Sequence, residues 1–303
     1  MSRRLFYCDH YAIPLPPGHK FPMTKYRLIR DLLSSDGHFS FACAPLADPA
    51  LIELAHDPTY VQHFLSGSLP QPVIRRIGFP WSHGLVQRTL ASVGGTLSAT
   101  REALASGWGG NLAGGTHHAF RSEGSGFCVF NDIAVAVRWA QREGQITRAA
   151  ILDLDVHQGD GTAQIFENDP AVFTASMHAK SNFPLRKQYS TIDIELTDGT
   201  GDGDYLRSLD MLLPQVFGFE PDILFYQSGV DGLSSDTLGK LALTHAGLKE
   251  RDRRVMAAAQ AHHIPFVVTL GGGYSNPIQL TAEAHANTFR TASEIFNCAE
   301  LIK

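Results

Sequence analysis

The segment Ala149–Gly161, with the sequence AAILDLDVHQGDG, most constrains what this chain can fold into. It starts as a short apolar run that is typical of a buried strand, and we expect a strand over Ala149–Val156. Side chains alternate between the two faces of a strand, so Asp153, Asp155 and His157 are predicted to share one face. Buried polar groups are unfavourable unless they bind something, and carboxylates and imidazoles are usual metal ligands. Taken alone, the segment fits a strand that ends in solvent about equally well.

The composition restricts the class of protein. The chain has 303 residues, of which 44% are hydrophobic, and this is enough for one large α/β domain over residues 1–303. The net charge is -5 and no basic stripe is visible, so we expect no nucleic-acid partner. We assign Arg251, Arg253 and Arg254 to the solvated face of a helix.

The cysteines and the apolar runs indicate the compartment. No two cysteines have C-x-x-C spacing, and a chain of this length does not need disulfides to hold it together. Free thiols in a reducing compartment are therefore expected at Cys8, Cys43, Cys128 and Cys298. No apolar run reaches membrane length, and no apolar leader follows Met1. We predict a soluble cytoplasmic protein without a membrane partner.

Strand-like and helix-like runs alternate along the chain. This order predicts an α/β fold with an open, mostly parallel sheet and helices on both faces. The clearest strands are expected at Ala149–Val156, Val172–His178, Ile223–Gln227 and Phe266–Leu270. The helices are expected at Gly84–Ala105, Ile133–Arg142, Asp204–Val216, Ala246–His262 and Pro277–Thr291.

Polar clusters follow three of these strands. Beyond the cluster at Asp153, they are Ser228–Gly232 and Gly271–Tyr274. Ligands of open α/β sheets bind beyond the carboxyl ends of the strands, so the three clusters are predicted to form one site. Two long loops, Tyr11–Pro22 and Gly107–Phe130, are expected beside it, because long glycine- or proline-rich loops in compact domains are usually functional or disordered.

Five motifs occur in a fixed order along the chain. They are Gly114–Phe120 (GGTHHAF), Gly126–Asp132 (GFCVFND), Asp153–Gly161 (DLDVHQGDG), Gly229–Asp236 (GVDGLSSD) and Leu270–Tyr274 (LGGGY). Over about the whole chain this set resembles the zinc-dependent histone deacetylase family of the arginase/deacetylase superfamily. Within that family, three further segments resemble the class IV type and its bacterial relatives: Arg76–Trp81, Asp198–Tyr205 and Asp236–Lys240.

The resemblance implies a metal centre. Asp155, His157 and Asp231 would be its three protein ligands, and an open fourth position is the pattern of catalytic zinc. The metal would lower the pKa of a water molecule and polarise the acyl carbonyl. Zinc suits these ligands, although Fe²⁺ fits the same set. The family also implies a structural K⁺ ion near the backbone of Asp153, Asp155 and His157. Ser176 and Met177 would lie at the same ion.

The resemblance also assigns the catalytic groups. His118 would act as general base and then as the acid that protonates the leaving amine, with Asp160 orienting it. His117 would give electrostatic help and would be oriented by Asp153. A carboxylate on the far imidazole nitrogen fixes the tautomer and raises basicity. Tyr274 would donate its hydroxyl to the developing oxyanion.

The substrate would enter a narrow tunnel. Phe127 and Phe183 would form walls around an aliphatic lysine stem, although either ring fits an ordinary core position as well. The carbonyl of Gly126 would accept the N–H of the scissile amide. The segment Ile77–Ser82 lacks the acidic rim residue with which family members often grip a peptide backbone, and this places peptide recognition in doubt.

These residues predict a metal-dependent hydrolase of linear amide bonds, which removes acetyl or longer acyl groups from Nε-acyl-lysine. Its partners would be acyl-lysine peptides or small acylated amines. One alternative is a deacetylase of small amides such as acetylpolyamines. Such an enzyme is expected to carry an acidic gatekeeper at the position of Leu238, and the leucine argues against this alternative. A second is a silent acyl-lysine-binding scaffold, although His117, His118 and Tyr274 are all present. A binuclear arginase-type enzyme is disfavoured, because Gly229 stands where such enzymes place an aspartate.

Overall fold

One parallel sheet organises the molecule. The computed structural model describes the backbone of residues 2–300 and the side chains of residues 2–296. Within this range the strands follow the order β2-β1-β3-β8-β7-β4-β5-β6, and every neighbouring pair is parallel. The strands are β1 Arg3–Tyr7, β2 Phe39–Cys43, β3 Trp108–Asn111, β4 Ala149–Asp153, β5 Val172–Ala179, β6 Ile192–Leu196, β7 Ile223–Gln227 and β8 Phe266–Thr269. The predicted α/β fold with a mostly parallel sheet is confirmed.

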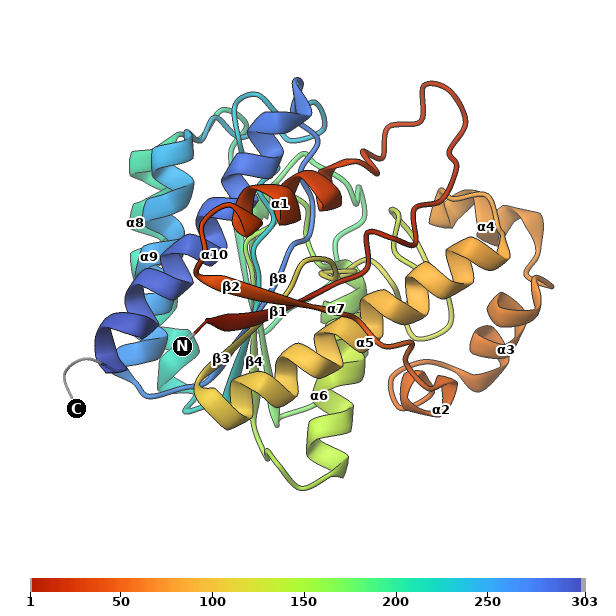
Figure 1. Ribbon diagram of the computed structural model, residues 1–303, viewed down its shortest axis with the longest axis horizontal. Coiled ribbons are helices and arrows are strands. Elements are labelled where there is room, and N and C mark those ends of the chain that lie inside the picture. The colour runs from red at the N-terminus through yellow and green to blue at the C-terminus, as the bar shows by residue number, and fades with distance from the viewer. Residues whose placement is uncertain (1, 301–303) are drawn as a thin grey trace.

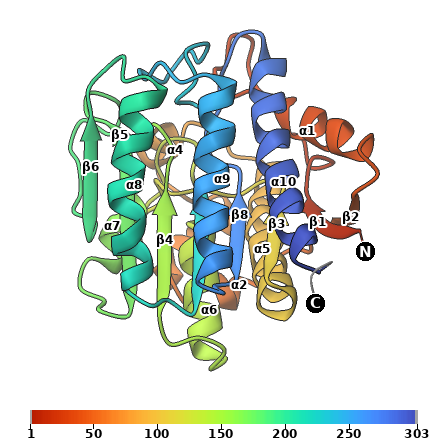
Figure 2. The ribbon, with the colours of Figure 1, turned by 90° about the vertical axis from the view of Figure 1, so that its left-hand side faces the viewer.

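Helices cover both faces of this sheet (Figures 1 and 2). One face carries α1 Lys25–Ser34, α8 Asp202–Gly218, α9 His245–Ala261 and α10 Ile278–Glu300. The other face carries α5 His83–Ser106, α6 Asp132–Arg142 and α7 Asp160–Phe166. A group of short helices lies beyond α5: α2 Pro49–Ile52, α3 Pro58–Ser66 and α4 Gln71–Ile77. None of the described helices is long and apolar enough to cross a membrane.

The predicted strand at Ala149–Val156 is too long. β4 ends at Asp153, so the expected alternation of side chains does not extend to Asp155 and His157. A chain of side-chain-to-backbone hydrogen bonds replaces the strand. The N–H of Asp155 donates to Oδ1 of Asp153 at 3.1 Å, and the N–H of His157 donates to Oδ1 of Asp155 at 3.0 Å. Such bonds fold the backbone into successive tight turns.

The loop predicted at Gly107–Phe130 contains a strand that the sequence did not indicate. β3 has the sequence WGGN, and its two glycines resemble a turn. Gly109 is required because α5 packs directly on this strand: a Cβ atom there would overlap the backbone carbonyl of Ala99. β3 is held between β1 and β8, so sheet pairing and close helix packing outweigh its low strand propensity.

Arg251 does not lie on a solvated helix face, which corrects the prediction for this residue. Its side chain is 1% exposed and forms an ion pair with Asp252 at 2.8 Å. It also donates to the carbonyl oxygens of Gly229 at 2.6 Å and Ser228 at 3.3 Å. Arg253, by contrast, is an exposed residue that pairs with Glu250. Arg251 thus supports the loop after β7 from within the core.

The described cysteines are free thiols. Cys8 and Cys128 are buried, and Cys43 is exposed. The side chain of Cys298 lies outside the described residues. Burial raises the pKa of the Cys128 thiol well above its usual value, which agrees with a small buried apolar residue.

Candidate metal centre and catalytic site

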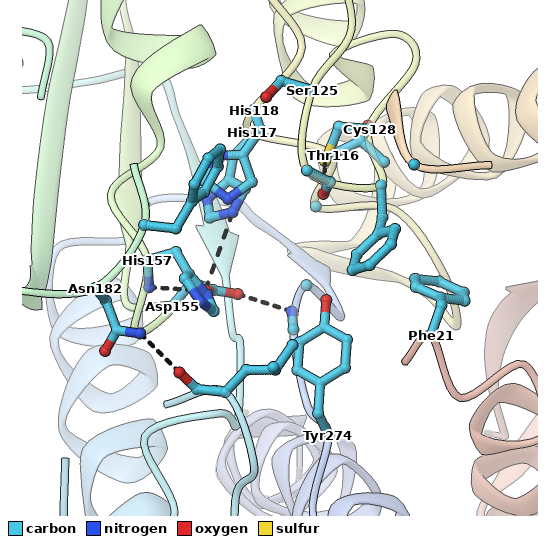
Figure 3. Close-up of a pocket in the computed structure, with 18 of the residues that line it drawn as sticks. Phe21, Thr116, His117, His118, Ser125, Cys128, Asp155, His157, Asn182 and Tyr274 are labelled. Carbon is cyan, nitrogen blue, oxygen red and sulfur yellow. Dashed lines mark hydrogen bonds and ion pairs between the residues drawn. The ribbon is translucent and has the colours of Figure 1, made fainter. Parts of the chain in front are cut away.

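A cavity of about 550 Å³ opens at the carboxyl ends of the central strands. Segments that follow β3, β4 and β8 line it, and they include the predicted residues His117, Asp155 and Tyr274. In Figure 3 the imidazoles of His117 and His118 and the phenol of Tyr274 face the same space, with Asp155 and His157 beside it. The three polar clusters therefore form one site, as predicted.

Asp155, His157 and Asp231 come together at the floor of this site. One ligand atom from each lies within 4.8 Å of the others. Nδ1 of His157 is 3.0 Å from Oδ1 of Asp155 and 3.1 Å from Oδ2 of Asp231. Asp155 and His157 follow β4, and Asp231 follows the neighbouring strand β7. Strand pairing thus places ligands that are far apart in the sequence within reach of one ion.

The surrounding groups hold the two carboxylates in place. Oδ2 of Asp155 accepts a hydrogen bond from the N–H of Gly272 at 2.7 Å and from Nε2 of Gln227 at 3.1 Å. Oδ1 of Asp231 accepts from the N–H of Val156 at 2.9 Å. The approach of the Gly272 backbone requires glycine, because a Cβ atom there would overlap the carboxylate of Asp231.

The electrostatics of this cluster favour a bound cation. Burial and the neighbouring charge of Asp155 raise the pKa of Asp231 to about 7. Burial opposes protonation of His157, but the carboxylates of Asp155 and Asp231 outweigh it and raise its pKa to about 10. Two buried carboxylates this close repel each other unless positive charge lies between them. Two oxygens and one imidazole nitrogen are a donor set that zinc accepts, so these residues fit a divalent metal.

Each histidine of the pair has its own carboxylate. Nδ1 of His117 is 2.6 Å from Oδ2 of Asp153, and Nδ1 of His118 is 2.6 Å from Oδ1 of Asp160. The two imidazole rings are 4.1 Å apart between centroids. All four side chains are buried. The structure therefore brings together both predicted histidine–aspartate pairs.

The two histidines have different protonation states. Burial opposes protonation of His117, but the carboxylates of Asp153 and Asp155 outweigh it and raise its pKa to about 9. Burial and the nearby charge of His117 lower the pKa of His118 to about 4. At neutral pH His117 is therefore a cation and His118 a neutral imidazole. A neutral imidazole accepts protons, and a fixed cation stabilises negative charge.

Tyr274 faces the cavity as a protonated phenol. Burial, with the charges of Asp231 and Asp155, raises its pKa well above the usual value, so its hydroxyl keeps the proton that it donates. Its backbone N–H donates to Oδ2 of Asp236 at 2.6 Å. The same carboxylate group accepts from the N–H of Leu238 and of Gly239. Asp236 therefore fixes the backbone that carries this phenol.

Aromatic rings form the walls above the polar floor. Phe127 contacts Tyr274 at a centroid distance of 6.3 Å and Phe21 at 5.3 Å. Phe183 packs instead against His118 at 4.9 Å, and 42% of its surface is exposed. Phe127 has a φ of 66°, which is unusual for a bulky residue and is found mostly at functional sites. Gly126, which precedes it, also lines the cavity.

The residues implied for a K⁺ ion lie beside this site. Ser176 of β5 pairs in register with Asp153 of β4. Its hydroxyl is buried and lies 2.9 Å from Nδ1 of His178. Met177 is fully buried in the same strand.

Three residues at the site were not singled out from the sequence. Lys25 is fully buried, and its Nζ donates to the carbonyl oxygen of Gly271 at 2.9 Å. Gln227 is the last residue of β7 and contacts Asp155. Asp236 was read only as part of a motif, although it holds Tyr274. For Gln227 and Asp236, their place at and after the end of a predicted strand was an available signal. Lys25 gives none, because it opens an ordinary amphipathic helix.

Comparison with known proteins agrees with this geometry. The Histone deacetylase domain model matches residues 19–291. An uncharacterized protein of Picosynechococcus sp. is 46% identical over 303 residues, covering 98% of this chain and 100% of that protein. Histone deacetylase 2 of Arabidopsis thaliana is 30% identical over 270 residues, covering 84% of this chain and 70% of that protein.

A solved structure supports the fold. The HD domain of HDA15 matches with a TM-score of 0.80 at 19% identity, covering 97% of this chain and 90% of that one. At this identity the match concerns the fold alone. The family model, however, spans most of the sequence and includes Asp155, His157, Asp231 and both histidine–aspartate pairs. By its sequence and its fold, the chain belongs to the histone deacetylase family.

Proposed function

We propose that this protein hydrolyses the amide bond of an Nε-acyl-lysine side chain and releases acetate or a longer carboxylic acid. The carrying observation is the combination of three buried potential metal ligands with two histidine–aspartate pairs around one cavity. A metal, a general base and donors to the developing oxyanion are the parts that metal-assisted amide hydrolysis uses.

Asp155, His157 and Asp231 would hold the metal, which we propose to be zinc, with Fe²⁺ as the other candidate. When bound, such a metal acidifies a water molecule and polarises the acyl carbonyl. The remaining work falls to the side chains. His118, neutral and held by Asp160, accepts the proton of the attacking water and then passes it to the leaving amine.

Two groups stabilise the negative charge that develops on the acyl oxygen. His117 remains a cation because its Nδ1–H donates to the carboxylate of Asp153, whose negative charge stabilises the imidazolium. Tyr274 donates its phenolic hydrogen, and one such donor typically contributes about 2.7–4 kcal/mol to the transition state. The carbonyl of Gly126 accepts the N–H of the scissile amide, which orients the substrate.

The walls suit an aliphatic stem that ends in an amide. Phe127 and Phe183 would flank the methylene groups of lysine, in line with their place along the cavity. Leu238 lines the same cavity, where a polyamine substrate would call for an acidic residue to hold its second ammonium group. An acyl-lysine is therefore favoured over an acetylpolyamine.

Further parts of the proposal concern the protein as a whole. We assign the chain to the class IV-like members, treat it as a single catalytic domain, and expect it in the cytoplasm. A structural K⁺ ion beside Ser176 and Met177 belongs to the same proposal. Its test is the loss of thermal stability when K⁺ is replaced by a large organic cation at constant ionic strength.

The test of the activity is turnover of one lysine peptide that carries acyl groups from acetyl to myristoyl, followed by mass spectrometry. Tyr274→Phe should lower kcat by about 10²–10³-fold with little change in KM. Tyr189→Phe is the matched control, because Tyr189 is 80% exposed and does not line the cavity. The preferred acyl group gives the chain-length specificity.

The outcome separates the competing functions. No release of any acyl group by the zinc-loaded protein would overturn the lysine-deacylase proposal. Binding of an acyl-lysine peptide without turnover would then favour the scaffold, and turnover of acetylpolyamines alone would favour a small-molecule deacetylase.

A further inference from the structure

The mouth of the catalytic cavity is cationic. Arg75 and Arg76 of α4 and Lys240 on the segment after β7 line the cavity and are exposed. Among the lining residues the sole carboxylate is that of Asp155, at the floor. The chain as a whole has a net charge of -5. The mouth therefore differs in sign from the average of the molecule.

The three cations differ in whether a carboxylate already neutralises them. Arg76 forms an ion pair with Glu123, and Lys240 lies 3.8 Å from a carboxylate oxygen of Asp198. Arg75 has no hydrogen-bond or ion-pair partner among the residues that the structure describes. Its guanidinium is therefore free to bind an anion from outside the protein, and a guanidinium matches a carboxylate with two parallel hydrogen bonds.

The backbone of α4 ties this arginine to the tunnel wall. The carbonyl of Arg76 accepts a hydrogen bond from the N–H of Gly126 at 3.2 Å, and the carbonyl of Ile77 accepts from the N–H of Phe127 at 2.8 Å. Gly126 and Phe127 line the cavity that the substrate would occupy. The segment that carries Arg75 is therefore fixed to the wall of the cavity that the acylated side chain would occupy.

We propose that Arg75 makes the enzyme selective for substrates with a carboxylate next to the acyl-lysine, and that basic segments are disfavoured. This inference rests on the proposed deacylase function and concerns the part of the substrate outside the tunnel. The carboxylate has two chemical sources: an Asp or Glu side chain in an acidic peptide, or the α-carboxylate of an acyl-lysine at a chain end. The unpaired guanidinium of Arg75 attracts either one.

The test compares kcat/KM for four peptides with the same acyl-lysine: one neutral and capped, one with flanking Asp, one with flanking Lys and one with a free terminal carboxylate. The protein should prefer the Asp peptide over the Lys peptide by about threefold to tenfold at low ionic strength, because exposed ion pairs are weak. The preference should shrink at high salt, as screening requires. The fourth peptide tells whether a terminal carboxylate serves as well.

Arg75→Glu should reverse the order of the Asp and Lys peptides. Because Arg75 has no ion pair among the described residues, its loss breaks no such contact, and Arg75→Gln should give equal rates. Arg142→Glu is the control, since Arg142 is an exposed arginine at the end of α6 that does not line the cavity. The alternative role of Arg75, a favourable interaction with the C-terminal end of α4, would change Tm but not the ratio of peptides.

The possible failures are distinguishable. If no peptide is turned over, the proposed function itself has failed. If the neutral peptide is turned over but the Asp and Lys peptides react equally, or Arg75→Glu leaves their ratio unchanged, only the role of Arg75 is overturned.

Discussion

The Nζ atom of Lys25 donates a hydrogen bond to the carbonyl oxygen of Gly271 at 2.9 Å, and the lysine side chain is fully buried. The same ammonium group lies 5.3 Å from the centroid of the Tyr274 ring. A residue from the start of the chain thus holds the glycine segment that leads to the phenol of the site.

Replacement of Lys25 by Met should lower kcat/KM through misplacement of this segment. The substitution keeps the volume of the side chain but leaves the carbonyl of Gly271 unpaired, and a buried unpaired polar group costs about 1–3 kcal/mol. We expect the loss mainly in kcat, measured with the preferred acyl peptide. Lys249→Met is the control, because Lys249 is half exposed and pairs with Glu294. Equal kinetics in both variants would contradict a positioning role for Lys25.

The stability of the protein should depend on pH through the same lysine. Burial lowers the pKa of Lys25 to about 8, although Asp231 and Asp155 oppose the shift, whereas the unfolded chain keeps the usual value. Between these two values the unfolded state binds more protons, so stability rises with pH. Relative to Lys25→Met, the metal-free protein should gain about 2 kcal/mol between about pH 7.5 and about pH 9.5. Denaturant unfolding of both proteins at each pH measures this gain, and parallel curves would refute it.

Replacement of Asp153 and of Asp160 should shift the acidic limb of the pH profile of kcat/KM in opposite directions. Asp153→Asn removes the main carboxylate that keeps His117 charged, and the repulsion that lowers the pKa of His118 weakens. His118 then binds its proton more tightly, and the limb moves to higher pH. Asp160→Asn removes a carboxylate that raises the pKa of His118, so the limb moves to lower pH. Both should lower kcat. Profiles measured with excess zinc test the signs, and shifts in the same direction would rule the assignment out.

Removal of the metal should abolish activity and reduce stability. Without a cation the carboxylates of Asp155 and Asp231 repel each other, and a ligand that binds only the folded state stabilises it. Chelation should lower Tm, and zinc should restore both Tm and turnover. Asp231→Asn should reduce the metal content measured by mass spectrometry, whereas Asp210→Asn should not, because Asp210 is an exposed partner of Arg254. Full metal content in Asp231→Asn would exclude this residue as a ligand.

Arg251 and Arg253, both on α9, should differ sharply in their contribution to the free energy of unfolding. Arg251→Met leaves Asp252 buried without its ion-pair partner and frees the carbonyls of Ser228 and Gly229, so we expect a loss of about 3–5 kcal/mol. Arg253→Met removes only an exposed pair with Glu250, which contributes about 0–1 kcal/mol. Urea unfolding compares them. Restored stability in the double variant Arg251→Met with Asp252→Asn would attribute the loss to the unpaired charge.

The sequence predicts those elements of the fold whose apolar residues are also the buried residues in the structure. β7 lies at Ile223–Gln227, where we expected it, because a continuous apolar run between turn residues is typical of a central strand. The sequence analysis did not predict β3, because Gly109 resembles a turn residue and is required instead by the close packing of α5, which no local pattern reveals. In the site, the residues of the sequence motifs lie close together, as expected. Their catalytic roles stay predictions.

Long-range pairing explains the residues that the sequence analysis missed or misassigned. Arg251 stands between charged neighbours on α9 and therefore looks like a surface residue. It is buried because its guanidinium donates to the backbone carbonyls of Ser228 and Gly229, which follow β7. Lys25 likewise follows a proline-rich loop, and only the folded chain brings it to Gly271. The periodicity of apolar residues indicates which face of a helix is buried. It does not indicate which polar side chain will donate a hydrogen bond to the backbone of a segment that is distant in the sequence.

The order of the strands also determines when a metal can be captured. As the chain is synthesised, Asp155 and His157 appear first, then Asp231, and only later Gly272, whose N–H orients the carboxylate of Asp155. The three ligands come together once β7 pairs with β4, and the N–H of Gly272 reaches Asp155 only once β8 pairs with β7. A chain that ended before β8 would keep the three proposed ligands but lack the backbone donor that orients Asp155, so we expect it to bind a metal ion more weakly.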